Sequence, residues 1–257
     1  MGFSIKFSNI NKSKLKDIRL AIFLGLSGLV FIYFFSLILL LIFSALFGEL
    51  IFTNTGVMLL GSLGLGLGLF TLSFLYLHFT KTPLTFIDLH FPTKSDISYV
   101  LAGLFVLFLA IFSAAIIFSY IGAETATHSV ESIATSNPKT LLYFIPISLL
   151  LIGPSEELLY RNIIQKLLYN SFSPKISIII SSIIFSAVHL FAYSGGNLSQ
   201  NFISTLNSLL VIFILSLIIG AVYYKTKNLF SAALLHGLYD SIIFLVLFYQ
   251  YSFSGLA

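Results

Sequence analysis

The run TLLYFIPISLLLIGPSEELLYRNIIQKLL, residues 140–168, decides how this chain folds. Its first half is apolar enough to enter a lipid bilayer, whereas its second half carries Glu156, Glu157 and Arg161. A charge at the centre of a membrane-spanning helix costs about 2.5–3.5 kcal/mol on insertion scales, so such a residue is by default a functional-site hypothesis. The run therefore predicts a membrane span that carries a polar site.

The rest of the chain has the composition of an integral membrane protein. Of its 257 residues, 58% are hydrophobic and only 9% are charged, and the mean hydropathy is +1.05. A soluble domain carries about 25% charged residues, so this composition excludes a cytosolic enzyme, a disulfide-linked secreted module and a disordered tail. The absence of Cys excludes thiolate metal sites and cysteine nucleophiles. The net charge of +4 comes from basic residues beside apolar runs, as in topology determinants, so no nucleic-acid partner is expected.

Apolar runs along the chain predict the fold class. A bilayer core of about 30 Å is crossed by about 20 apolar residues of helix. Because backbone groups in lipid must be hydrogen-bonded internally, each run is expected to be helical. The prediction is an all-α fold, a polytopic transmembrane helix bundle of about seven to eight spans. The runs are residues 20–47, 56–77, 97–121, 140–168, 176–193, 202–224 and 229–249.

The distribution of basic residues predicts how the chain is threaded through the cell membrane. Cytoplasmic loops carry an excess of Lys and Arg, which indicates a cytoplasmic N-terminus and a C-terminus outside. The first apolar run is far longer than the 7–15 residues of a signal-peptide core, so it is expected to remain as an anchor. All basic residues except Lys139 fall on or near the inner side: Lys6, Lys12, Lys14, Lys16, Arg19, Lys81, Lys94, Arg161, Lys166, Lys175, Lys225 and Lys227.

Ionisable residues divide the chain into two halves. The interiors of the first three predicted spans carry no charge, whereas the last four spans carry several ionisable side chains. Residues 1–135 are therefore predicted to form an N-terminal cytoplasmic segment with three accessory transmembrane helices, and residues 139–250 a membrane domain that performs the chemistry. The ionisable residues of these last spans are Glu156, Glu157, Arg161, His189, His236 and Asp240.

Helix geometry predicts that these groups meet. At a rise of 1.5 Å per residue, Glu156, His189 and Asp240 lie about 18–21 Å from the inner ends of their helices, and His236 about 12 Å. These depths are compatible with one polar layer, and we expect the layer to be reachable from the inner side, through an opening toward the inner leaflet or the cytosol.

Local spacing adds two expectations for the fourth span. Glu157 and Arg161 stand at i and i+4 with the acid first, the favourable order for an ion pair on a helix. Pro154 cannot donate to the helical hydrogen-bond ladder, so a kink is expected near residue 153 with the carboxylates just beyond it.

Three motifs in this half resemble those of a known protease family. Glu156-Glu157-Leu-Leu-Tyr-Arg161 resembles the E-E-x-x-x-R motif of the CPBP intramembrane proteases, which include CAAX proteases and bacteriocin-processing enzymes of the type II CAAX prenyl endopeptidase-like group. Phe185-Ser-Ala-Val-His189 is similar to the F-x-x-x-H motif, and His236-Gly-Leu-Tyr-Asp240 to the H-x-x-x-N/D motif. The motifs occur in order on separate predicted spans. The resemblance covers roughly residues 139–247 and identifies residues 139–250 as the catalytic domain.

This resemblance implies an intramembrane endopeptidase and a role for each polar side chain. Glu156 and His189 would activate a water molecule, and His236 with Asp240 would stabilise the oxyanion. An Asn at position 240 could donate a hydrogen bond to the oxyanion, whereas the ionised carboxylate of Asp240 cannot donate one. Its role is therefore left open between a protonated carboxyl, a group that orients His236, and a metal ligand. The Glu157–Arg161 pair would be structural and would lie behind these catalytic groups.

A divalent metal such as zinc is left open in the same way. Zinc could be ligated by two His and two carboxylates and still have a coordination position open for water. The residues concerned are His189, His236, Glu156 and Asp240. The H-E-x-x-H signature is absent, and the ligands would come from three separate helices. Both glutamate-activated water and metal assistance therefore remain as hypotheses.

The resemblance also suggests partners, and two other classes of function compete with it. The implied substrate is a membrane-anchored or prenylated protein or a precursor peptide such as a bacteriocin, held in the lipid bilayer. The first alternative is a catalytically silent membrane scaffold or bacteriocin-immunity protein with the same fold. The second is a transporter that uses the carboxylates as a proton relay, although no paired broken helices of the transporter kind are seen in the sequence.

Overall fold

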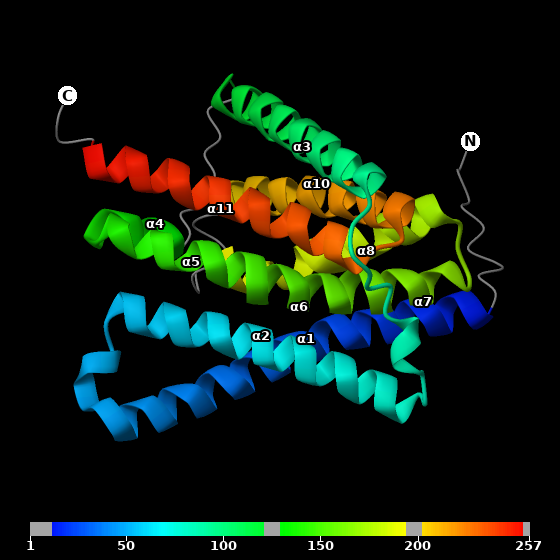
Figure 1. Ribbon diagram of the computed structural model, residues 1–257, viewed down its shortest axis with the longest axis horizontal. Coiled ribbons are helices and arrows are strands. Elements are labelled where there is room, and N and C mark those ends of the chain that lie inside the picture. The colour runs from blue at the N-terminus through cyan, green and yellow to red at the C-terminus, as the bar shows by residue number, and fades with distance from the viewer. Residues whose placement is uncertain (1–11, 121–128, 194–201, 254–257) are drawn as a thin grey trace, which may run out of the picture.

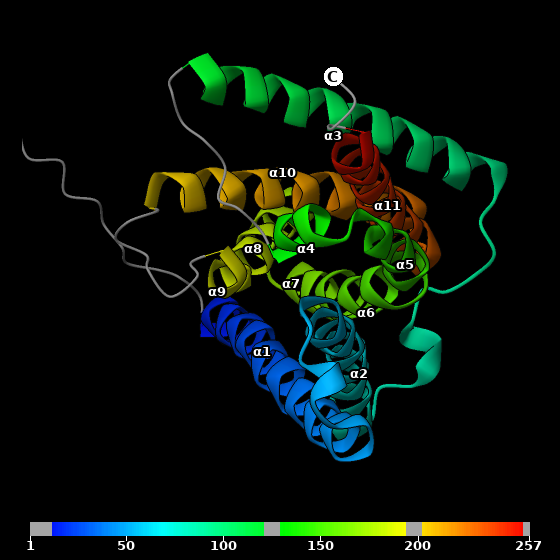
Figure 2. The same cartoon turned by 90° about the vertical axis from the view of Figure 1, so that its left-hand side faces the viewer.

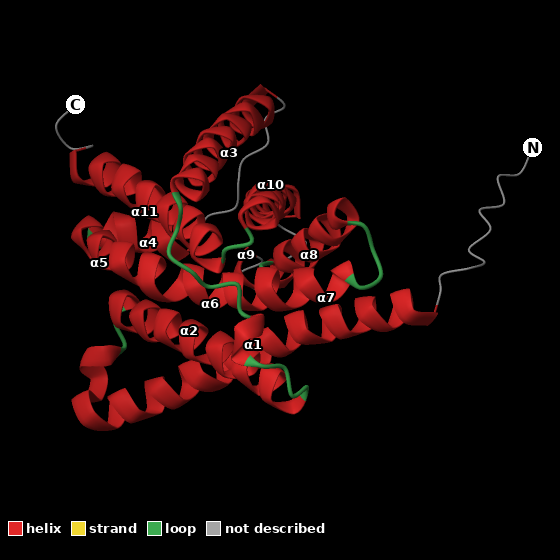
Figure 3. Ribbon diagram, turned by 45° about the vertical axis from the view of Figure 1, so that its right-hand side comes forward, coloured by secondary structure: helices red, strands yellow, loops and turns green. Residues whose placement is uncertain are grey.

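The computed structural model describes residues 12–120, 129–193 and 202–253, and all regular structure in these ranges is helical (Figure 3). Within them, seven helical segments are long and apolar enough to cross a membrane, which confirms the predicted all-α polytopic bundle. The spans are α1 (Lys12–Phe47), α2 (Asn54–Phe79), α3 (Lys94–Tyr120), a composite helix over Pro138–Tyr169, α8 with α9 over Pro174–Ala192, α10 (Phe202–Thr226) and α11 (Leu229–Phe253).

The composite helix is the span with an unusual backbone. The chain stays helical through residue 153, where a kink is predicted, and has wide π-helical turns on both sides of the prolyl segment. Pro154 supplies no amide hydrogen, so the ladder must adjust around it. Such π turns inside α-helices are frequently found at functional sites. Its parts are η3 (Pro138–Thr140), α5 (Leu141–Ile147), η4 (Ser148–Ile152), α6 (Gly153–Glu157), η5 (Leu158–Gln165) and α7 (Lys166–Tyr169).

Four of the spans form a central bundle, and the other three flank it. The composite helix packs against α11 and α8 (Pro174–Val188), and α10 packs against α8 and α11 (Figure 1). The α1–α2 pair covers one side of this bundle, whereas α3 lies on the opposite side against α10 and α11 (Figure 2). The short helix α4 (Ser129–Ser136) precedes the composite helix, and α9 (Leu190–Tyr193) follows α8 after a turn at His189. The division into residues 1–135 and 139–250 stays a prediction.

Helices α1 and α2 pack backbone to backbone through glycines of α2. A Cβ atom added to Gly64 would lie 2.6 Å from the Cα of Ser36, and one added to Gly68 would lie 2.7 Å from the carbonyl carbon of Phe31. Small residues at such positions let membrane helices approach closely. The outer surfaces of the bundle instead present large apolar side chains, such as Phe23 at 64% and Phe105 at 69% exposure, as a lipid-facing surface requires.

The connection between α2 and α3 covers the end of the bundle where basic residues gather. Its Asp88 donates from the backbone N–H to Oδ1 of Asn162 at 3.0 Å and accepts on Oδ2 from the hydroxyl of Tyr223 at 2.7 Å. The same carboxylate oxygen lies 3.1 Å from Nζ of Lys166, and the backbone N–H of Leu229 donates to the carbonyl of Asp88. One loop residue thus ties this basic end to the composite helix, α10 and α11.

Replacing Asp88 by Ala should destabilise this closure. Tyr223 is fully buried and would lose its charged acceptor, and a hydrogen bond to a charged group contributes about 1.5–3 kcal/mol. We expect Asp88→Ala to lower the free energy of unfolding by about that amount, measured by denaturation in detergent. Tyr223→Phe should lower the free energy of unfolding less in the Asp88→Ala background than in the wild type, because both substitutions remove the same hydrogen bond. Fully additive losses would contradict this account.

Candidate active site

A close helix crossing brings the motif residues together. A Cβ atom added to Gly153 would lie 2.9 Å from a carbonyl oxygen of α11, and one added to Gly237 would lie 2.8 Å from a Cα atom of η4. Larger residues would therefore push the composite helix and α11 apart. The crossing places His236, next to Gly237, against Glu156 and Glu157, which follow Gly153 on the composite helix.

The carboxylate of Glu157 accepts hydrogen bonds from two side chains, those of Arg161 and His236. One oxygen accepts from Nε of Arg161 at 2.6 Å and the other from Nδ1 of His236 at 2.7 Å, and the side chains of Glu157 and Arg161 are fully buried. Arg161 also donates from Nη1 to the hydroxyl of Ser216 on α10 at 2.9 Å. Because an ionised carboxylate can only accept, Nδ1 of His236 carries a hydrogen. Glu157 therefore both balances the charge of Arg161 and fixes the orientation of His236.

The other nitrogen of His236 faces two further carboxylates. Its Nε2 lies 3.6 Å from Oε2 of Glu156 and 3.7 Å from Oδ2 of Asp240. Glu156 is 6% exposed and His236 is 4% exposed, so this point is shielded from bulk solvent. Separations beyond about 3.5 Å are too long for a direct hydrogen bond, and a bridging water is the usual way in which such groups communicate.

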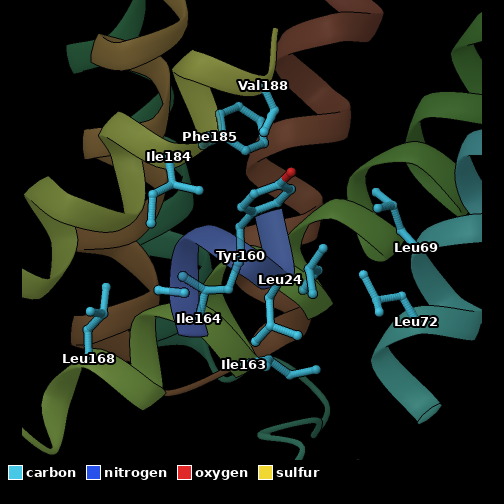
Figure 4. Close-up of a cluster of buried hydrophobic side chains, with 12 residues drawn as sticks. Leu24, Leu69, Leu72, Tyr160, Ile163, Ile164, Leu168, Ile184, Phe185 and Val188 are labelled. Carbon is cyan, nitrogen blue, oxygen red and sulfur yellow. The ribbon is translucent and has the colours of Figure 1, made fainter. Parts of the chain in front are cut away.

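Phe185 of α8 is the aromatic centre around which the other motif residues pack. Its ring lies edge-on to that of Tyr160 with centroids 4.8 Å apart, and Figure 4 shows the two rings next to one another. The guanidinium of Arg161 lies 5.2 Å from the same ring, and the imidazole of His189 has its centroid 4.6 Å away. Nδ1 of His189 donates to the carbonyl oxygen of Phe185 at 2.7 Å. A carbonyl only accepts, so a neutral His189 has its acceptor atom at Nε2.

A cavity of about 1130 Å³ adjoins this polar cluster. Its wall includes four His, Asp or Glu side chains, those of Glu156, His189, His236 and Asp240, while the rest of the wall is mainly apolar and comes mostly from α1, α2, α10 and α11. These four are the residues for which sequence analysis predicts catalytic roles. Glu157, fully buried and bonded to Arg161 and His236, lies behind the wall.

The direction of the cavity differs from the expectation. It runs along residues 32–40 in the second half of α1 and residues 54–65 in the first half of α2, away from the basic end. The cavity therefore lies on the other side of the polar layer from the basic end, and the expected opening toward the inner leaflet or the cytosol stays a prediction. Depth along a helix gives the level of a residue but not the side from which it is reached, and the loop around Asp88 occupies the basic end.

The polar cluster is not arranged as a preformed metal site. Among the residues that the structure describes, no group of three or more His, Asp or Glu side chains is placed to hold a metal ion. Nδ1 of His236 is engaged by Glu157, and Nδ1 of His189 is engaged by a backbone carbonyl. Bonds of this kind orient an imidazole whether its other nitrogen faces a metal ion or a water molecule, so metal assistance and glutamate-activated water both stay predictions.

Two serines in the site were missed by sequence reasoning. Ser148 donates from Oγ to Oδ2 of Asp240 at 3.1 Å, and Ser216 accepts from Arg161. Ser148 stands eight residues before Glu156, a spacing that puts both on one face of a regular helix, and this signal could have been used. Ser216 is one of several serines in apolar runs, and nothing in the sequence distinguishes it from the others.

Comparison with known proteins adds one finding. A family model described as type II CAAX prenyl endopeptidase Rce1-like matches residues 138–242. No curated protein and no solved structure matches the chain. The matched segment begins with the composite helix and ends within α11, just beyond Asp240, so it contains all the motif residues described above.

Adding one methyl group at the helix crossing should disrupt the site. Gly237→Ala would place a Cβ atom 2.8 Å from the backbone of η4, which cannot move as a flexible side chain could. Overpacking of this kind costs about 1–3 kcal/mol. We expect a lower unfolding temperature in detergent together with a loss of any activity that needs His236 beside Glu157.

A matched control is available on α2. Gly61→Ala adds the same methyl group inside a helix where no atom lies within 4 Å, so the unfolding temperature should not fall below the wild-type value. Equal destabilisation by both substitutions would show that the close approach at Gly237 is not the cause.

Proposed function

Residues 138–242 belong to the type II CAAX prenyl endopeptidase Rce1-like family, and from this premise we propose that the protein is an intramembrane endopeptidase whose active site is the cavity beside Glu156 and His236. The observation that carries the proposal is the convergence of one imidazole and two carboxylates at the wall of a large cavity inside a membrane bundle. Peptide hydrolysis needs an activated water, an oxyanion stabiliser and a proton for the leaving amine, and these groups can supply each of them.

Glu156 is proposed as the general base. Its Oε2 lies at the cavity wall, where it can accept a hydrogen bond from a water molecule. The water oxygen attacks the carbonyl carbon of the substrate while its proton passes to Glu156. When the tetrahedral intermediate collapses, the C–N bond breaks and Glu156 returns that proton to the leaving amine. General acid–base catalysis of this kind typically contributes about 10²–10⁴-fold.

His236 is proposed as the oxyanion donor. Glu157 fixes Nδ1–H, so the protonated imidazole presents Nε2–H toward the cavity. The negative charge that develops on the substrate oxygen would be stabilised there, and loss of one such donor typically costs about 2.7–4 kcal/mol. His189 is proposed to accept the second hydrogen of the attacking water on Nε2, since its Nδ1 is held by the carbonyl of Phe185. Asp240 flanks His236 and keeps its imidazole in place.

The substrate class follows from the surroundings of the site. The cavity is bounded by apolar side chains from membrane-spanning helices, so an extended segment of a membrane-anchored or prenylated protein, or an apolar precursor peptide, would fit it best. The excess of Lys and Arg at the other end of the bundle supports a cytoplasmic N-terminus and an external C-terminus. In that orientation the cavity extends toward the outer half of the membrane.

Glu156→Gln tests the proposal directly. The amide keeps the size of the side chain but cannot take a proton from water, so cleavage should fall at least about 100-fold. The measurement is incubation of the purified protein, in detergent or liposomes, with membrane-anchored peptides, followed by mass spectrometry of the products. Asp17→Asn, a comparable change near the basic end of α1 and away from the cavity, should leave cleavage at the wild-type level.

The same assay separates the alternatives. Addition of a chelator should leave cleavage unchanged, and loss that zinc restores would instead favour metal assistance. A folded Glu156→Gln protein that retains full biological effect would point to a silent scaffold or immunity protein. Flux that follows a pH gradient in proteoliposomes, with no new peptide termini, would point to a transporter.

A further inference from the structure

Ser148 contacts the motif residue whose role the family pattern leaves open. It is fully buried and is the first residue of η4. Its Oγ donates to Oδ2 of Asp240 at 3.1 Å. The same oxygen of Asp240 faces Nε2 of His236 at 3.7 Å. The hydroxyl of Ser148 therefore holds the carboxylate oxygen that lies beside the imidazole.

The position of Ser148 follows from the close crossing of the two helices. A Cβ atom added to Gly237 would lie 3.1 Å from the carbonyl oxygen of Ser148, so η4 and α11 are in backbone contact there. The composite helix meets α11 at two polar points, one between Glu157 and His236 and one between Ser148 and Asp240. His236 and Asp240 stand one helical turn apart, so two attachments fix the face of α11 that carries both.

The chemistry of the contact suits an aspartate. A hydroxyl can donate, and an ionised carboxylate can only accept, so the pair is complementary without any amide at this position. The side chain of Asp240 is 21% exposed and lines the cavity, so without this donor it could turn away from His236 toward solvent in the cavity. A charged acceptor also makes the hydrogen bond stronger than one between neutral groups.

We propose that Ser148 is a positioning residue for the hydrolysis, which holds Asp240 beside His236 and Glu156 through its hydroxyl. This inference rests on the proposed function and adds a side chain of η4 to the residues that position the site. Ser148 does not line the cavity, so it acts through Asp240 and not on the substrate.

Ser148→Ala should lower kcat about tenfold and leave KM within about twofold, because the loss concerns the alignment of the reacting groups and not the apolar binding surface. The measurement is the peptide-cleavage assay over a range of substrate concentrations. The matched control is Ser73→Ala on α2, which removes an equally buried hydroxyl that makes no hydrogen bond within the described part of the chain. Its kcat should equal that of the wild type.

The Asp240→Ala background distinguishes positioning from packing. If Ser148 acts through Asp240, Ser148→Ala should cause no further loss of kcat or of unfolding temperature in that background. Ser148→Thr as a single substitution keeps the hydroxyl, so its activity should exceed that of Ser148→Ala. A folded Ser148→Ala protein with wild-type kcat would overturn the inference, as would an equal loss in both backgrounds. Should Asp240→Ala lack measurable activity, additive shifts in unfolding temperature would overturn it too. A wild-type protein that cleaves nothing would instead refute the proposed function.

Discussion

The candidate active site depends on one buried carboxylate, that of Glu157, which accepts from Arg161 on one oxygen and from His236 on the other. Removing one partner of a buried ion pair typically costs about 3–5 kcal/mol, because the remaining charge is left unpaired. Arg161 is in turn held by Ser216 of α10, so the composite helix, α10 and α11 are linked through this group. The arrangement gives His236 one orientation, with a hydrogen on Nδ1, before any substrate is bound.

Much of this site was predictable because ionisable side chains inside a membrane span cost free energy and are therefore rare. Four ionisable residues are conspicuous in this apolar chain: Glu156, His189, His236 and Asp240. Their depths along separate helices predicted that they share one polar layer. All four line one cavity. The number and class of the helices followed equally directly from the length of the apolar runs, since a bilayer of fixed thickness leaves few choices.

Other features were beyond the sequence because they depend on how two helices meet. Hydropathy gives the depth of Glu156 along its helix but not which helices line the cavity beside it, so the extension of the cavity along α1 and α2 could not be predicted. The wide turns around Pro154 change which residues point inward, and a regular helical wheel does not describe them. The contact of Ser148 with Asp240 depends on the backbone contact that Gly237 allows; the spacing of Ser148 from Glu156 indicates a shared helix face but not this partner on α11.

The loop around Asp88 has a further consequence for how the helices are held around the cavity. The hydrogen bonds of Asp88 to Asn162 and Tyr223, its ion pair with Lys166 and the bond from the backbone of Leu229 join the composite helix, α10 and α11 at the basic end. None of these four partners lines the cavity of about 1130 Å³. The helices that carry the motif residues are therefore attached to one another at a point outside the cavity, so their mutual position does not depend on the apolar side chains of its wall alone.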